Sequence, residues 1–219
     1  MNLLELLQQP AAIRFFGLAG ACAAALGALI AALPYRGRQG EGYSILNHFI
    51  SELGEVGVSR HAWAFNWGLI LCGLLLLPCS IGLGLLIPGW WARLGLAAGV
   101  VTSLAVAAVG LFPMNNLDPH VKAAMTYFRM GLVMVLFFTI AIAAQPNPPV
   151  LPRSMAMTGV PAILAYAFFL VYMRVTYRPG QDALGPIMNN RPRFWTLPFA
   201  EWMIFWTTVP WLFALALGL

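Results

Sequence analysis

The sequence predicts an all-α fold: a polytopic membrane bundle of six transmembrane helices with one short interfacial amphipathic helix. Of the 219 residues, 61% are hydrophobic and only 9% are charged, whereas soluble domains carry roughly 25% charged residues. Apolar stretches of about 20 residues, the length at which a helix crosses the hydrocarbon core, recur along the chain. We expect residues 1–219 to form one transmembrane domain with spans at about 13–33, 63–87, 91–112, 120–144, 155–173 and 195–219.

Small residues are frequent in the first span. Gly17, Gly20, Ala24 and Gly27 recur at three- or four-residue spacing, which lets another helix approach closely. The second span contains Pro78, and a transmembrane helix tolerates a proline there with a kink.

A short turn separates the third span from the fourth. The third span ends before Pro113, and Asp118, before Pro119, is the expected N-cap of the fourth. His120 then lies in the first helical turn, where the helix dipole disfavours a charged imidazole and favours a neutral ligand or base. A Pro-rich linker, 145–152, leads to the fifth span, and an Arg- and Asn-rich loop leads to the sixth.

Six crossings place both chain termini on one side of the membrane and the loops after spans one, three and five on the other, which we call the odd-loop face. All three histidines and most carboxylates belong to this face. Ionisable groups in or near a bilayer are costly, so their gathering on one side favours a functional site. The alternative is that the odd loops hold more polar residues simply because they are longer.

The cations predict the orientation of the protein in a plasma or bacterial inner membrane. Short-loop cations are more numerous on the odd-loop face than on the opposite face, where only Arg14, Arg93 and Arg153 lie. The positive-inside rule therefore places the odd loops in the cytoplasm and both termini outside. The cations of the odd-loop face are Arg36, Arg38, Arg60, Lys122, Arg174, Arg178, Arg191 and Arg193.

Residues 44–54 have a helical pattern that is too short to span the membrane. An apolar stripe contains Ile45, Leu46, Phe49, Ile50 and Leu53, and the opposite stripe contains Ser44, Asn47, His48, Ser51, Glu52 and Glu55. Gly54 fits a helix C-cap. We therefore expect an amphipathic helix that lies in the interface or folds back over the bundle.

The polar stripe of this helix is compatible with three chemistries. Ser51 with a histidine and Glu52 would suit acyl or phosphoryl transfer, with Ser51 as nucleophile. His48 and Glu52, completed by His120 or His61, would suit a metal. Histidine, carboxylates and arginines together would suit a lipid headgroup. A plain solvated helix face is the fourth interpretation.

The candidate residues follow from these alternatives. Without an HExxH or G-x-S-x-G motif, no metal and no cofactor is expected. The catalytic candidates are Ser51, Glu52 and His120, and the binding candidates are His48, Glu55, Asn66 and Arg178.

Two charges lie within the predicted spans. Arg129 lies nine residues after His120, and Glu201 lies six residues after Trp195. Both helices start from the odd-loop face, and an intramembrane charge needs a partner. We therefore expect a structural ion pair between Arg129 and Glu201.

A set of ordered motifs resembles a known family. ISELG at 50–54 is followed by FNWGLILCG, then by GLFPMN, the helix start at His120 and a last span with Glu201. This set is similar to an uncharacterised family of six-span membrane proteins, the domain of unknown function 998, from about Leu18 to the C-terminus. The resemblance implies that Ser51, Glu52, Asn66 and His120 are recurring polar positions. More distantly, the layout resembles the FRAG/DRAM group, which is linked to lipid remodelling.

These observations favour a protein that binds or processes a lipid or lipid-linked substrate in a polar pocket on the odd-loop face. The alternative is a non-catalytic structural or assembly subunit of a larger membrane complex. The expected partners are membrane lipids and other membrane-protein subunits. A nucleic-acid partner is not expected, because basic residues are not interleaved with aromatics in a groove-like run.

Overall fold

The structure, a computed structural model, describes residues 2–176 and 190–219. Within these residues six helices are long and apolar enough to cross a membrane, so the chain is an integral membrane protein, as predicted. Their ends differ from the expected ones by less than one helical turn. They are α2 (Pro10–Ala32), α3 (Ala62–Leu86), α4 (Trp90–Leu111), α5 (Leu117–Ala143), α6 (Ala156–Thr176) and α8 (Thr196–Gly218). The shorter elements are α1 (Leu3–Leu7) and the 3-10 helices η1 (Ile50–Gly54) and η2 (Arg153–Met155).

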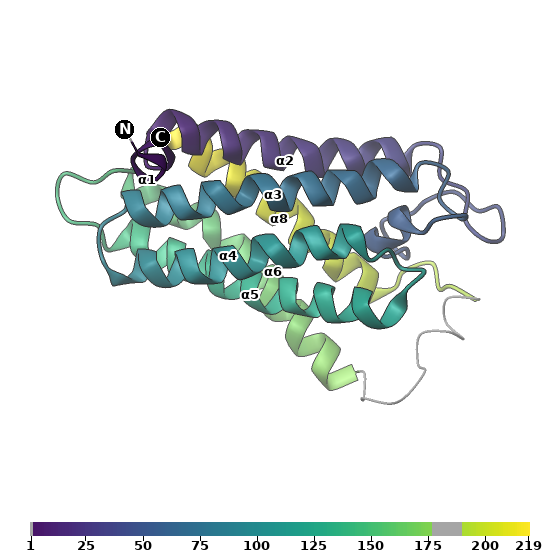
Figure 1. Ribbon diagram of the computed structural model, residues 1–219. Coiled ribbons are helices and arrows are strands. Elements are labelled where there is room, and N and C mark those ends of the chain that lie inside the picture. The colour runs from purple at the N-terminus through teal and green to yellow at the C-terminus, as the bar shows by residue number, and fades with distance from the viewer. Residues whose placement is uncertain (1, 177–189) are drawn as a thin grey trace.

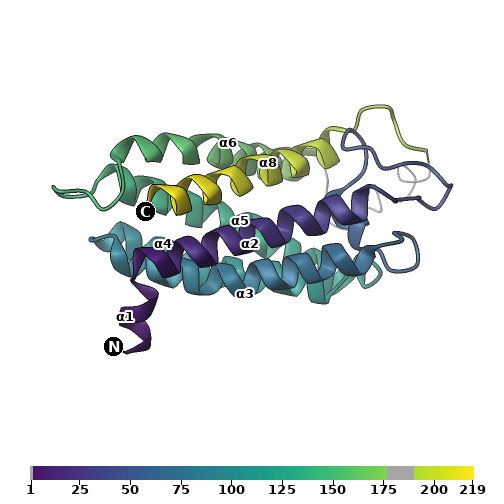
Figure 2. The same ribbon diagram turned by 90° about the horizontal axis from the view of Figure 1, so that it is seen from above.

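The six long helices close into a ring. Each packs against the described helix before and after it in the chain, and α8 returns to pack against α2. Figures 1 and 2 show these helices running side by side, with both chain ends at one end of the bundle. The loop that carries η1 lies at the opposite end, which is the odd-loop end of the molecule (Figure 1).

Glycines let α2 and α3 approach very closely. A Cβ on Gly27 would lie 2.6 Å from the backbone oxygen of Ala64, and a Cβ on Gly68 would lie 2.7 Å from that of Ala23. Without these glycines the two backbones could not lie at this distance, as the small-residue spacing of the first span indicates. The α3 helix continues through Pro78.

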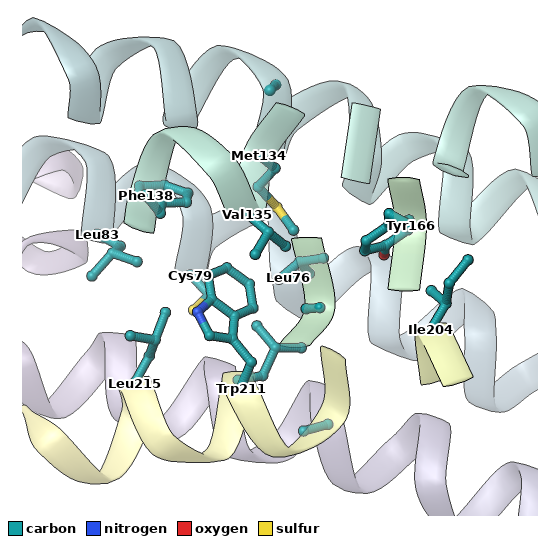
Figure 3. Packing of buried hydrophobic residues seen from close by; sticks show 14 of the residues in the cluster. Leu76, Cys79, Leu83, Met134, Val135, Phe138, Tyr166, Ile204, Trp211 and Leu215 are labelled. Atoms are coloured by element: carbon teal, nitrogen blue, oxygen red, sulfur yellow. The ribbon is translucent and has the colours of Figure 1, made fainter. Parts of the chain in front are cut away.

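Large apolar side chains fill the ring on the side away from η1. Trp211 of α8 is 2% exposed and lies beside Cys79 and Leu76 of α3, while Met134 and Phe138 face them from α5 (Figure 3). Helices that are distant in sequence therefore share one hydrophobic core, which fills the interior of the ring at this end.

The predicted amphipathic helix over 44–54 is wrong in extent. The chain makes a single turn after Ser44 and is extended at Phe49, and only Ile50–Gly54 is helical, as a 3-10 helix. In a continuous helix the carbonyl of Leu46 would accept from the N–H of Ile50. Instead it accepts from the N–H of Trp195 at 2.8 Å, while the N–H of Ile50 donates to Glu201 at 2.9 Å. Tertiary hydrogen bonds thus replace the helical ones.

The start of α5 also differs from the expectation. Asn116, not Asp118, is the residue before the first helical position, and Asp118 lies in the first turn. There its carboxylate accepts a hydrogen bond from Lys122, one turn later, at 2.7 Å. The helix begins earlier because the turn at Pro113 already directs the chain into it: the N–H of Asn116 donates to the carbonyl of Pro113 at 2.9 Å.

Candidate functional site in the intramembrane cavity

The η1 segment closes the odd-loop end of the ring. Ser51, Glu52, Leu53 and Gly54 are all buried, so this segment is not a solvated interfacial helix. Hydrogen bonds tie the loop to the chain that leads into α8: the Asn47 amide donates to the carbonyl of Pro192 at 2.9 Å. The position of η1 therefore depends on residues about 140 positions later in the chain.

Glu52 holds η1 through a buried ion pair with Arg191. The carboxylate is 1% exposed, and the two guanidinium nitrogens donate to its two oxygens at 2.9 and 2.6 Å. The N–H of Phe49 also donates to this carboxylate, at 2.8 Å. Both oxygens are occupied by partners within the protein, and Glu52 does not line the cavity described below. Its surroundings are therefore those of a positioning residue.

A contact between Gly54 and Asn66 connects the ISELG motif with the FNWGLILCG motif. The Asn66 amide donates to the carbonyl of Gly54 at 3.0 Å. A Cβ on Gly54 would lie 2.2 Å from the Asn66 side-chain oxygen, so the close approach needs glycine. The expected C-cap role of Gly54 is wrong, since η1 ends at this residue and Glu55 follows as its cap.

An aromatic cluster around His48 packs against the outer side of η1. The His48 ring is 2% exposed and lies near the rings of Tyr35 and Tyr43. The Tyr43 hydroxyl donates to the carbonyl of Phe49 at 2.9 Å and accepts from the Trp202 indole at 3.0 Å. Burial raises the pKa of Tyr43 well above its usual value, so the phenol remains a donor at neutral pH. His48 therefore belongs to a structural cluster beside the cavity and does not line it.

The centre of the ring contains a narrow cavity of about 90 Å³. This volume is several times the roughly 10–15 Å³ that one water molecule needs, but below the roughly 300–1,000 Å³ of drug-sized ligand pockets. Along α5 its walls extend from His120 to Met134, which is about 21 Å at the helical rise. Most of the wall is apolar, apart from the hydroxyl-bearing side chains of Thr102, Tyr127 and Thr208 and the polar end described below, so the cavity suits a slender apolar chain. The apolar wall consists of Ala24, Ile50, Phe65, Leu69, Cys72, Leu76, Val106, Val109, Ala124, Phe128, Met134, Ile204, Phe205, Val209 and Leu212.

Three polar side chains line the odd-loop end of this cavity, and we call them the polar end. They are Ser51 of η1, His120 in the first turn of α5, and Glu201 near the start of α8. Two of them, Ser51 and His120, were candidates from the sequence. The structure thus brings part of the predicted site together, within the bundle.

The remaining candidates lie elsewhere. Glu55 is buried and pairs with Arg38 in the loop, and Asn66 binds η1. Arg178 lies outside the described residues.

The structure does not contain the predicted ion pair between Arg129 and Glu201. Among the described residues Glu201 is bound by the N–H of Ile50, whereas Arg129 is exposed on the outer surface of α5. The sequence position of each residue indicates its depth along its helix from the odd-loop end. The rotation of each helix about its axis, which decides whether a side chain faces the ring, is set by packing.

Arg191 was considered in the sequence only as one of several loop cations. Its pairing with Glu52 has no local signal, because the two residues are 139 positions apart. A buried glutamate in an apolar segment requires a cation or several donors, and this requirement was the available hint. In residues 2–176 and 190–219, no three side chains of metal-ligating types lie close enough together to hold an ion.

A family model described as "Protein of unknown function (DUF998)" matches residues 18–218. No curated protein and no solved structure matches the chain.

Proposed function

The chain belongs to the DUF998 family of proteins of unknown function, and we propose that this member binds a membrane lipid by taking one apolar chain into the central cavity. The observation that carries the proposal is the cavity itself, which is narrow, mostly apolar and bounded at one end by Ser51, His120 and Glu201. A ligand with a long apolar chain and one small polar end matches this distribution of polarity.

The surroundings of the polar end support binding more strongly than a hydrolytic triad. Glu52, the carboxylate expected to assist Ser51 and His120, is bound by Arg191 and Phe49 instead. Ser51 and His120 remain candidates for contacting the ligand, because both line the cavity.

The assembly-subunit alternative has no separate support. Helix α6 is the least buried of the six spans, and Figure 1 shows its C-terminal half diverging from the bundle. Several of its exposed side chains, such as Phe168 and Val175, are apolar. Lipid chains cover such a face as well as a partner protein would.

Occluding the cavity tests the proposal. Val106 of α4 lines the cavity and is 6% exposed, whereas Val101 on the same helix is 41% exposed on the outer surface. Host cells would be grown with a diazirine-bearing fatty acid, so that all acyl lipids carry the photoreactive group. After illumination, mass spectrometry of the purified protein would locate the crosslinks. We expect crosslinks at inward-facing residues of α5 and α8, and we expect Val106→Phe to remove most of them.

The Val101→Phe variant is the matched control and should leave the inward crosslinks unchanged. Thermal unfolding in detergent verifies that both variants fold, and Val106→Ile replaces Val106→Phe if the larger side chain prevents folding. Crosslinks confined to outward-facing residues in the wild-type protein would refute the proposed function.

A further inference from the structure

The hydrogen-bonding groups at the polar end are partly unused within the protein. One carboxylate oxygen of Glu201 accepts from the N–H of Ile50 at 2.9 Å, which leaves the other oxygen without a described partner. Within the described part of the chain, the one hydrogen bond of the Ser51 hydroxyl goes to the sulfur of Met114, at 3.7 Å, and a thioether is a weak acceptor. These groups can therefore bind a ligand without first breaking a strong hydrogen bond.

The tautomer of His120 follows from its one partner. Its Nδ1 lies 2.8 Å from the carbonyl oxygen of Phe112, and a carbonyl can only accept, so Nδ1 carries the hydrogen. In the neutral ring Nε2 is then an acceptor. His120 thus offers an acceptor to the cavity in the same region as the Glu201 carboxyl group.

The cavity wall carries no cation. Among the described residues that line it there is no lysine or arginine, and Arg191 is bound to Glu52. A phosphate or carboxylate at the polar end would lie beside the Glu201 carboxyl group without a compensating positive charge. Burying such an anion is costly. The wall therefore disfavours anionic lipid ends, whether Glu201 is ionised or not.

From these contacts we infer that the cavity takes an uncharged lipid whose polar end is a free hydroxyl, such as a long-chain alcohol or a glyceride with one free hydroxyl. This inference rests on the proposed function. A hydroxyl donates one hydrogen bond, to Glu201 or to Nε2 of His120, and accepts one, from the hydroxyl of Ser51. An ammonium group has no acceptor for Ser51, and an ether has no hydrogen for Glu201 or His120.

Three photoreactive probes with the same C16 diazirine chain test the inference. They differ only at the polar end: hexadecanol, hexadecanoic acid and hexadecyl methyl ether. Each is added to vesicles that contain the purified full-length protein, at a pH at which the free acid is ionised. The measurement is the crosslink yield at cavity residues that Val106→Phe abolishes.

We expect the alcohol to label the cavity at least about tenfold more than the acid or the ether, the ratio that about 1.4 kcal/mol produces. The Glu201→Gln variant keeps an acceptor for the N–H of Ile50 and removes the carboxylate. This variant should therefore raise cavity labelling by the acid and lower the ratio of alcohol labelling to acid labelling.

The possible outcomes distinguish a failure of the hydroxyl preference from a failure of the proposed lipid binding. Equal or stronger cavity labelling by the acid or the ether would overturn the inference and leave the proposed function standing. Labelling by all three probes that Val106→Phe does not change would overturn both.

Discussion

Single carboxylates at the odd-loop end have distinct roles that their residue type does not reveal. Glu52 is sequestered by Arg191, Glu55 pairs with Arg38, and Glu201 receives one backbone N–H and lines the cavity. Of these three described carboxylates, only Glu201 lines the cavity. The residue type thus indicates that a partner is needed, while the partner itself depends on the fold.

The Glu52–Arg191 pair provides a prediction at the residue scale. Removing one partner of a buried ion pair leaves an uncompensated charge, which costs roughly 3–5 kcal/mol. Because the Arg191 side chain is 14% exposed, we expect Arg191→Met to lower the free energy of unfolding by about 3 kcal/mol, near the lower end of this range. The measurement is thermal or denaturant unfolding in detergent micelles.

Arg193, exposed in the same segment, supplies the matched control. Arg193→Met should change the free energy of unfolding by less than about 0.5 kcal/mol. Adding Glu52→Gln to Arg191→Met should recover part of the loss, since the buried charge is then gone. Equal destabilisation by the two arginine variants would show that the ion pair does not hold η1.

At the scale of elements, close helix contacts depend on a few glycines among many. Gly20 and Gly27 lie on the same helix and in the same small-residue pattern. A Cβ on Gly20 would meet its nearest neighbour, Leu75, at 3.4 Å, an ordinary contact, whereas a Cβ on Gly27 would approach the Ala64 oxygen to 2.6 Å. The sequence pattern identifies the helix face, but only the packed structure separates the essential position from the tolerant one.

The two glycines therefore predict opposite results for the same substitution. Gly27→Ala should force α2 and α3 apart and destabilise the protein, typically by 1–3 kcal/mol as overpacking does. Gly20→Ala should be neutral or slightly stabilising, because alanine favours the helix by up to about 1 kcal/mol over glycine. Unfolding midpoints in detergent compare the two, and a larger loss for Gly20→Ala would contradict the α2–α3 packing.

The whole molecule is a ring of helices with its two ends chemically different. The odd-loop end carries η1, its buried carboxylates and the polar end of the cavity, and the other end carries both termini. This asymmetry agrees with the polar distribution along the sequence. The membrane orientation of the two ends is a separate question, which the cation count answers only as a prediction.

Cysteine labelling tests the orientation. Gly42 is exposed in the loop that precedes η1, and Val150 is exposed in the loop between α5 and α6. Under the positive-inside rule a membrane-impermeant maleimide should label Val150→Cys in intact cells and Gly42→Cys only after permeabilisation. The parent protein, in which Cys72 and Cys79 are buried and Cys22 is exposed within α2, measures the background. The reverse labelling pattern would place the odd loops outside.

The amino-acid sequence was sufficient to predict the six spans, their approximate ends and the end of the bundle at which the polar residues gather. Apolar length is a local property, because every backbone group in a spanning segment must be satisfied within its own helix. For the same reason the short run around Ser51 was recognised as unable to cross. The helix predicted from the pattern over 44–54 is nevertheless wrong in extent. The N–H of Trp195 donates to Leu46 and the N–H of Ile50 donates to Glu201, and these hydrogen bonds replace the helical ones.

Which polar residues lie together depends on how the helices pack. The ring closes between α8 and α2, Glu201 lines the same cavity as Ser51 and His120, and Arg129 is exposed on the outer surface of α5. Such pairings depend on helix rotation and on contacts between residues more than 100 positions apart, which leave no periodic signal in the chain. The cavity and its polar end are therefore consequences of packing, built from residues that the sequence could mark as polar but could not place.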